Sequence, residues 1–163
     1  MSKTTISSMI GITISLFSYA LFAQDIDELQ IKTEIEETYL NYVERFSAFD
    51  VDYIVENVFI LPRYNLGGDG PVLIPDDEAL RNFMESIFLD LESQNYSRSV
   101  ASDFSICVLN GSAALLSVNV TRYSENGSIL RQATPTYIYA KTEDHWRIIG
   151  QGAGPGRKKV ECQ

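Results

Sequence analysis

Hydrophobic residues recur at intervals of three and four in two long stretches of the chain, and this spacing is typical of amphipathic helices. The first stretch predicts a helix over roughly residues 25–47. Its apolar positions, all on one face, are Ile31, Ile35, Tyr39, Tyr42, Val43 and Phe46. Asp50 then predicts the cap of a short second helix, because its side chain can accept from the amides of the following turn.

The second long stretch predicts a third helix that begins after Asp76 and Asp77. Its apolar stripe consists of Leu80, Phe83, Met84, Ile87, Phe88 and Leu91. A continuous stripe at helical spacing is far more often part of a core than of a ligand site. We therefore expect this helix to pack against a sheet.

Alternation of apolar and polar residues replaces the helical spacing after residue 110. One face of a predicted strand carries Ala114, Leu116, Val118 and Val120, and the other face carries Ser117, Asn119 and Thr121. Asn110-Gly111 and Asn126-Gly127 predict the turns on either side of this strand. The next strand covers residues 129–141, with Pro135 at a bulge or an edge, and a last strand follows it.

Two shorter strands, residues 59–66 and 71–74, precede the third helix. Pro62 interrupts the first of them, which a central strand would not tolerate, so the pair predicts a hairpin at the edge of a sheet. The order of all elements predicts an α+β fold, in which a curved antiparallel sheet holds about three helices against one face and leaves room for a pocket.

The first residues predict a targeting signal. Lys3 precedes an apolar stretch that ends at the small residue Ala23, and the first acid is Asp25. This pattern predicts a secretory signal over residues 1–23, with cleavage before Gln24 and a secreted or periplasmic mature protein. A retained membrane anchor is the weaker interpretation, because polar residues and a glycine interrupt the stretch, so the cleaved protein is not expected to be integral to a membrane.

The chain is strongly acidic, with a formal net charge of −9 at pH 7. Removal of residues 1–23, which hold one Lys and no acid, makes the mature chain more negative still. Nucleic acids and anionic membranes would repel such a protein, so neither is expected as a partner.

The two cysteines, Cys107 and Cys162, allow two interpretations. In an oxidising compartment they could pair and join a strand to the tail. Alternatively Cys107 is buried in the core and Cys162 is exposed in a Gly-rich, flexible tail over residues 152–163. We favour the unpaired state, because a core of this size does not need a cross-link.

Three segments resemble the nuclear transport factor 2-like superfamily, within it the SnoaL-like group. They are Tyr39-Leu40-Asn41-Tyr42, Ala48-Phe49-Asp50, and residues 144–148 around His145-Trp146. The resemblance extends over residues 26–151 of a domain that we place at 24–151. Closest is a bacterial family that shares a Tyr-x-Arg-Ser step at 96–99 and an Arg-Tyr-x-x-Asn-Gly step at 122–127.

The resemblance implies a cone-shaped, cystatin-like half-barrel with an apolar pocket between the helices and the concave face, often in a homodimer formed through the sheets. The superfamily includes isomerases, cyclases, dehydratases and proteins that only bind or scaffold. The fold alone cannot choose among these activities.

The isomerases of this group use a carboxylate base opposite a Tyr and a protonated Asp. Tyr42 matches the Tyr by its position before Ala48-Phe49-Asp50. Residues 61–66 and 134–138, where the two acids should lie, contain none. His145 is the sole histidine and is expected in an exposed turn. One His and two separated Cys do not provide the ligand spacing of a metal centre, so neither a metal nor another cofactor is expected.

Polar residues that interrupt apolar surface are the candidates for the pocket. They are Tyr42, Tyr53, Arg63, Tyr64 and Tyr96, with Arg122 and Thr136 as outer candidates. Tyrosine hydroxyls and an arginine suit a ligand with a carbonyl or carboxylate on an apolar body. The alternative is that each of these side chains only fills the core.

Two functions follow from these candidates. We favour an exported, non-catalytic domain that binds a small apolar ligand or a partner chain. The alternative is a cofactor-independent isomerase, dehydratase or cyclase. An acid directed into the pocket, such as Asp103 or Glu56, would favour the enzyme.

The export hypothesis rests on Lys3, the apolar stretch and Ala23. Amino-terminal sequencing of the protein from fractionated cells is expected to begin near Gln24, because a signal peptidase cleaves after a small residue. Recovery of Met1 on soluble cytoplasmic protein would contradict export.

Overall fold

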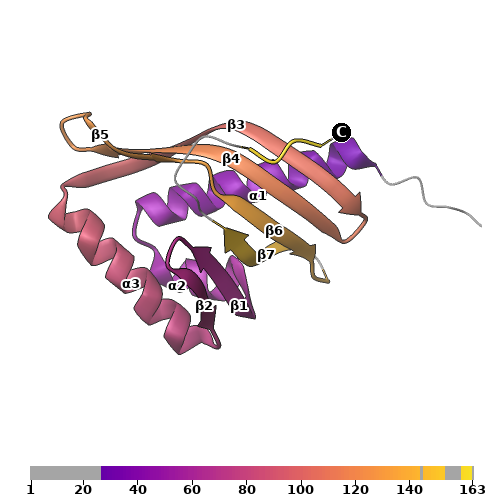
Figure 1. The fold of residues 1–163 in the computed structure, drawn as a ribbon, viewed down its shortest axis with the longest axis horizontal. Coiled ribbons are helices and arrows are strands. Elements are labelled where there is room, and N and C mark those ends of the chain that lie inside the picture. Colours follow the sequence, from indigo (N-terminus) through magenta and orange to yellow (C-terminus); the bar gives the residue numbers. More distant parts are fainter. Residues whose placement is uncertain (1–26, 144, 153–158, 163) are drawn as a thin grey trace, which may run out of the picture.

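The computed structural model describes residues 27–143, 145–152 and 159–162 of the 163-residue chain (Figure 1). Within these residues there are three helices, α1 (Glu28–Ser47), α2 (Val51–Asn57) and α3 (Asp77–Ser93). The seven strands are β1 (Phe59–Gly67), β2 (Gly70–Ile74), β3 (Tyr96–Asn110), β4 (Ala113–Ser124), β5 (Ile129–Ala133), β6 (Thr136–Lys141) and β7 (Trp146–Gly152). The predicted α+β fold is confirmed, and the predicted signal segment lies outside the described residues.

The strands form one open sheet in the order β2-β1-β7-β6-β4-β3, and β5 pairs with β4 beyond the end of β6. One pairing departs from the predicted antiparallel sheet, because β1 and β7 run parallel. Parallel neighbours need a long connection, and the whole of α3 and the strands β2 to β6 lie between these two. The β1–β2 hairpin forms the predicted edge, and the register of β1 on β7 jumps between Phe59 and Tyr64, around Pro62.

Each helix begins at an aspartate whose side chain accepts a backbone hydrogen bond. Asp27 accepts from the amide of Gln30 at 3.0 Å, and Asp76 caps α3 in the same way at 2.9 Å. Asp50 accepts from the amide of Tyr53 at 3.1 Å, as predicted for α2. The caps therefore fix where the helices start, because they satisfy amides that have no partner inside the helix.

The core lies between the helices and the concave face of the sheet. The predicted alternation along β4 is confirmed, since Ala114, Leu116 and Val118 are fully buried. At the end of the sheet, Trp146 is buried and its indole N–H donates to a carboxylate oxygen of Glu34 at 2.8 Å. That bond and one from Lys141 hold the pKa of Glu34 below its ordinary value, because both stabilise the charged carboxylate.

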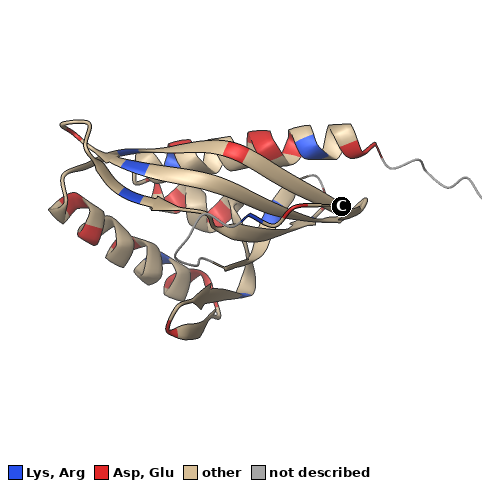
Figure 2. Cartoon of the chain, turned by 45° about the horizontal axis from the view of Figure 1, so that its top comes forward, with Lys and Arg blue, Asp and Glu red and all other residues tan. Residues whose placement is uncertain are grey.

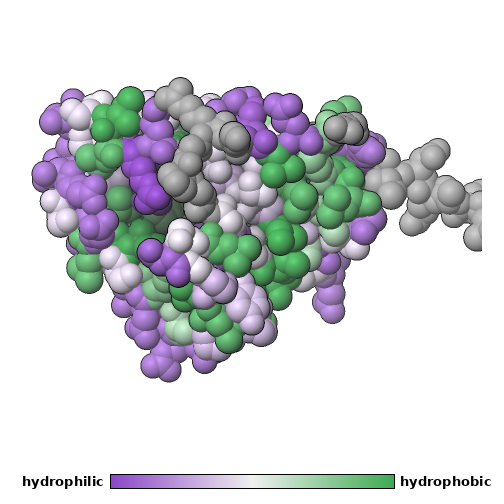
Figure 3. Space-filling view, in the orientation of Figure 1, coloured by the Kyte–Doolittle hydropathy of each residue, from purple (hydrophilic) through white to green (hydrophobic). Residues whose placement is uncertain are grey.

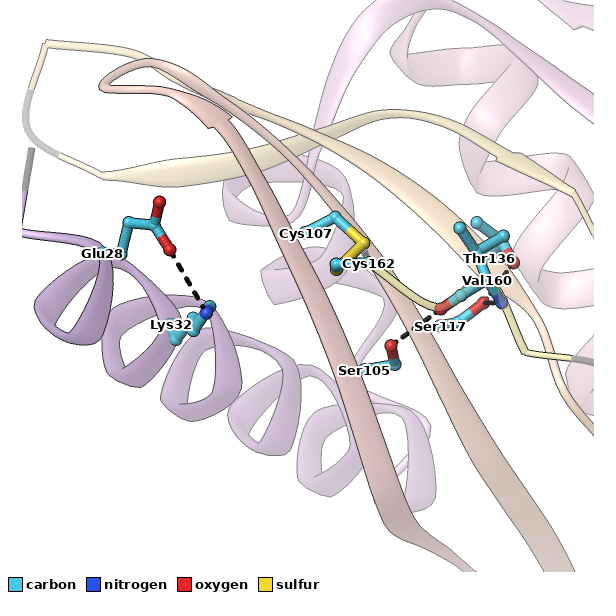
Figure 4. The surroundings of a disulfide bond; sticks show 8 residues. All are labelled: Glu28, Lys32, Ser105, Cys107, Ser117, Thr136, Val160 and Cys162. Carbon is cyan, nitrogen blue, oxygen red and sulfur yellow. Dashed lines mark hydrogen bonds and ion pairs between the residues drawn. A yellow bond between two sulfur atoms is a disulfide. The ribbon is translucent and has the colours of Figure 1, made fainter.

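Residues 159–162 lie across the outer face of β3 and β4, where Cys162 forms a disulfide with Cys107 (Figure 4). Beside the disulfide, the amide of Val160 donates to the hydroxyl of Ser117 at 3.1 Å. The carbonyl of Val160 accepts from the hydroxyl of Ser105 at 2.7 Å. This described part of the tail is thus attached to the sheet at several points.

The preference for unpaired cysteines is wrong. Ile106 faces the core, so the neighbouring Cys107 must face outward, because side chains alternate along a strand. Cys107 forms the disulfide with Cys162 on that outer face, and their Cα atoms are 5.4 Å apart, a distance that suits a disulfide. The sequence does not show which face of β3 points outward, and that face decides the pairing.

No helix in the described part of the chain is both long and apolar enough to cross a membrane.

The disulfide is expected to stabilise the fold, because it closes a loop of 55 residues that contains four strands. Replacing both cysteines by serine should lower the free energy of unfolding by about 2–4 kcal/mol. Urea unfolding followed by the fluorescence of Trp146 measures this change. A reducing agent should destabilise the wild type and leave the variant unchanged. Equal unfolding midpoints for oxidised wild type and variant would contradict a structural disulfide.

Phe88 and Phe83 lie on the same stripe of α3 but differ in burial. Phe88 is 6% exposed and packs on Phe46 and Phe49, with ring centroids 5.1 and 4.7 Å away, whereas Phe83 is only half-buried. Phe88→Ala should therefore cost about 3–5 kcal/mol of folding stability, and Phe83→Ala clearly less. Chemical denaturation of both variants tests the assignment, and equal losses would show that the face of α3 is misplaced.

Candidate functional site

A cavity of about 500 Å³ opens between α3, the hairpin strand β1 and the strands β4 to β6. Its apolar wall comes from both layers of the fold and consists of Phe46, Phe59, Phe83, Met84, Ile87 and Val120. In Figure 3 the surface is hollowed at this place, and green hydrophobic side chains line the hollow beside purple hydrophilic ones. Phe83 and Ile87, which the helical stripe assigned to the core, are thus also pocket residues.

Arg63 is the most unusual side chain of this cavity, because it lines the pocket and is only 1% exposed. Its guanidinium carbon lies 3.9 Å from the ring centre of Phe59, an arrangement typical of a cation–π contact. One terminal nitrogen, Nη1, donates to the side-chain oxygen of Gln151 at 3.3 Å. The other two nitrogens, Nε and Nη2, have no acceptor among the described residues.

No carboxylate neutralises this buried guanidinium within the described residues. Burial lowers the pKa of Arg63, because desolvation disfavours the charged form. An arginine nevertheless stays protonated at any ordinary pH. The wall of the pocket therefore carries a positive charge, with two donors that are closed to solvent and have no acceptor among the described residues.

Two tyrosines line the cavity together with Arg63, Tyr42 from α1 and Tyr137 from β6. Burial raises the pKa of both phenols above the ordinary value, so both remain protonated. Tyr137 accepts a hydrogen bond from the hydroxyl of Tyr39 at 3.3 Å, which leaves its own proton available. The deep polar groups of the pocket are thus mainly donors.

Two further arginines lie toward the mouth. Arg122 on β4 is half-buried, with its guanidinium carbon 4.9 Å from the ring centre of Phe46, and the exposed Arg131 is its partner on β5. Figure 2 shows the basic residues (blue) side by side on neighbouring strands at this end of the sheet. The single acid on the described lining is Asp90, which is exposed on α3. The pocket is therefore positively charged within an acidic protein.

Of the seven candidates from the sequence, the structure brings Tyr42, Arg63 and Arg122 together at the cavity. Tyr64 points away from it and is 55% exposed, because it follows Arg63 directly in a strand. Thr136 precedes the pocket residue Tyr137 and bonds to Ser117 on the outer face instead.

The other two candidates serve local structure. The hydroxyl of Tyr53 accepts from the side chain of Asn41 at 2.6 Å, outside the cavity lining. The hydroxyl of Tyr96 is bonded to Ser47 and to Ser99, at 3.1 and 2.7 Å, and Tyr96 does not line the cavity.

Sequence reasoning missed Tyr137 and Arg131 as pocket residues. Tyr137 differs from the chosen Thr136 by one position, and the strand register that separates them is a property of the sheet. The turn at Asn126-Gly127 could have indicated Arg131, since a hairpin that closes there pairs it with Arg122.

The acids that would have favoured an enzyme lie elsewhere. Asp103 forms an ion pair with Lys159 on the outer face of the sheet, and Glu56 is exposed on α2. His145 is exposed, as predicted, and accepts from Nε of Arg147 at 2.7 Å. Among the described residues, no group of three His, Cys, Asp or Glu side chains is placed to hold a metal ion.

Comparison with solved structures identifies the fold. A cystatin-like protein of unknown function from Nostoc punctiforme shares 18% identity, with a TM-score of 0.62, over 76% of this chain and 91% of that one. A single-residue variant of Rv3472, a protein of unknown function from Mycobacterium tuberculosis, shares 19% identity over 82% and 77% of the two chains, with a TM-score of 0.62. Such low identities establish a shared fold and no shared activity.

A third structure carries a functional description of its own. It is described as a candidate aromatic ring hydroxylase from Novosphingobium aromaticivorans, and it shares 16% identity over 81% of this chain and 93% of that one, with a TM-score of 0.58. A search of proteins with curated functions found no match to this chain. Residues 33–154 match a family of NTF2-like proteins (DUF6841), which confirms the superfamily that the sequence resembled, and the chain belongs to this NTF2-like family.

Proposed function

We propose that this chain is an exported, non-catalytic binding protein, which holds a small molecule with an apolar body in the pocket between α3 and the sheet. The observation that carries the proposal is a preformed cavity of about 500 Å³, whose lining combines apolar side chains from both layers of the fold with a similar share of polar surface. Ligand pockets are concave and roughly 300–1,000 Å³ in volume, with apolar surface for the body of the ligand and a few polar groups that orient it.

The chemistry of the lining favours binding over turnover. Proton transfer at neutral pH needs a group that can both gain and lose a proton there, in reach of the substrate. The deep polar residues are Arg63 and two tyrosines with raised pKa, so none of them exchanges protons near neutral pH. The one acid of the described lining, Asp90, is exposed on α3 and does not reach the deep part of the pocket.

The disulfide between Cys107 and Cys162 supports export. Disulfides form and persist in oxidising compartments and are rare in the cytosol. A periplasmic or secreted location is consistent with both the cross-link and the apolar segment that ends at Ala23.

A homodimer through the sheet stays a prediction with one added constraint. Residues 159–162 cover the outer face of β3 and β4, and Ser117 beneath them is buried. A partner subunit would therefore have to pack around this part of the tail.

A cofactor-independent isomerase, dehydratase or cyclase is the second candidate, and one observation favours it. Tyr42 and Tyr137 are protonated and line the same cavity, so their hydroxyls could donate to an oxyanion. The interior of the described pocket lacks the carboxylate base that such an isomerase needs.

Native mass spectrometry of the protein purified from its own host tests the proposal, and the same spectrum reports the subunit count. We expect a retained small molecule on the wild type. Ile87→Trp should abolish retention because it fills the cavity from α3. Leu89→Trp is the matched control, since Leu89 lies on the same helix, is 67% exposed and does not line the cavity.

Retention that Ile87→Trp leaves unchanged would place the ligand elsewhere and overturn the pocket assignment. Release of the bound molecule and renewed incubation with wild type and Tyr42→Phe separates the two candidates. Conversion by the wild type that Tyr42→Phe slows would favour the enzyme.

A further inference from the structure

Arg63 combines two properties that rarely occur together, nearly complete burial and incomplete hydrogen bonding. Its side chain is 1% exposed, yet Nε and Nη2 have no acceptor in the described part of the chain. Removing a charged group from water is costly, and proteins normally offset that cost with a counter-charge or a full set of hydrogen bonds. The neutral side-chain oxygen of Gln151, 3.3 Å away, is the one acceptor present among the described residues.

The free nitrogens share one edge of the guanidinium. The ring of Phe59 covers one of its flat faces at 3.9 Å, and Nη1 is directed to Gln151. What remains is the edge formed by Nε and Nη2, whose two N–H groups are parallel; this edge is closed to solvent in the structure, so the guanidinium has to turn toward the cavity to receive a ligand. This edge matches two oxygens that lie in one plane, which is the geometry of a carboxylate.

The neighbouring groups provide donors and no competing anion within the described lining. Tyr42 and Tyr137 line the same cavity as Arg63. Each protonated hydroxyl can donate a further hydrogen bond to an oxygen that Arg63 holds. Arg122 and Arg131 add positive charge toward the mouth, where an anion would enter.

The geometry points to an organic carboxylate as the ligand of this pocket, with its carboxylate on the Nε–Nη2 edge of Arg63 and its apolar body against Phe83, Met84 and Ile87. This inference deepens the proposed function and rests on it. The bound carboxylate would supply both the missing acceptors and the missing counter-charge. Arg63 is then the specificity-determining residue of the pocket.

A structural role for Arg63 and a ligand-binding role predict opposite effects of its removal on stability. If the guanidinium held the fold together, its removal would destabilise the protein. If instead it waits unpaired for a ligand, Arg63→Met should keep the apolar stem on Phe59, remove a buried charge and leave the melting temperature equal or higher. Such a gain in stability at the expense of binding is typical of functional residues.

A matched pair of probes tests the inference by calorimetry. 2-Naphthoate and 2-naphthamide have the same apolar body and differ in charge. The wild type should bind the acid at least about tenfold more tightly than the amide, since hydrogen bonds between charged groups are the strong ones. Arg63→Met should bind 2-naphthoate and 2-naphthamide with affinities that agree within about twofold, because the variant binds the acid more weakly and the amide as before.

Two control variants separate the effect of the paired N–H donors of Arg63 from the effect of its positive charge. Arg98→Met removes one positive charge at an exposed position of β3 outside the cavity lining, so it should leave the preference for the acid unchanged. Arg63→Lys keeps the charge and loses the paired donors, so most of the preference should disappear. Inorganic phosphate at the same concentration should not displace 2-naphthoate.

The outcomes separate this inference from the proposed function. Equal binding of acid and amide by the wild type overturns the carboxylate assignment and leaves a small-molecule pocket. Failure of both probes, together with a native spectrum free of ligand, overturns the proposed function as well. A preference that survives in Arg63→Met assigns the anion to the mouth arginines. A lower melting temperature of that variant, with no preference in the wild type, makes Arg63 structural.

Discussion

The parallel pairing of β1 with β7 is the contact on which the rest of the structure depends. It joins the helical first part of the chain to the long antiparallel strands, with Asn65 opposite Gln151 and the amide of Ile148 donating to the carbonyl of Val58 at 2.9 Å. Without this pairing, Arg63 would have no position beside Gln151.

Opposite faces of the sheet serve different purposes. The concave face carries the core and, at one end, the cavity with its arginines and tyrosines. The outer face is covered in part by residues 159–162, which the disulfide, the backbone of Val160 and the ion pair of Lys159 with Asp103 attach to β3 and β4. The contacts on the outer face of the sheet thus stabilise the fold, whereas the pocket on the concave face contains a buried charge that the described protein atoms satisfy only in part. Binding sites often contain groups that lower the stability of the fold.

The fold was largely predictable, because its signals are local. Asp50 and Asp76 cap their helices through amides three residues away, and the turn at Asn110-Gly111 closes the β3–β4 hairpin. The site was predictable in part. Tyr42, Arg63 and Arg122 were recognised as polar groups on apolar surface, while Thr136 was chosen in place of its neighbour Tyr137. A slip of one residue moves a side chain to the other face of a sheet, and turn chemistry alone does not fix that register.

The sequence by itself determined the three helices, the hairpins and the α+β order, because caps, turns and hydrophobic spacing act between residues close in the chain. Only the tertiary structure decided the parallel pairing of β1 and β7, the disulfide between Cys107 and Cys162, and the unpaired edge of Arg63. Each of these depends on groups that are far apart in sequence and meet through the register and curvature of one sheet. Arg63 shows this most directly, because its burial and its lack of a counter-charge among the described residues are properties of its surroundings.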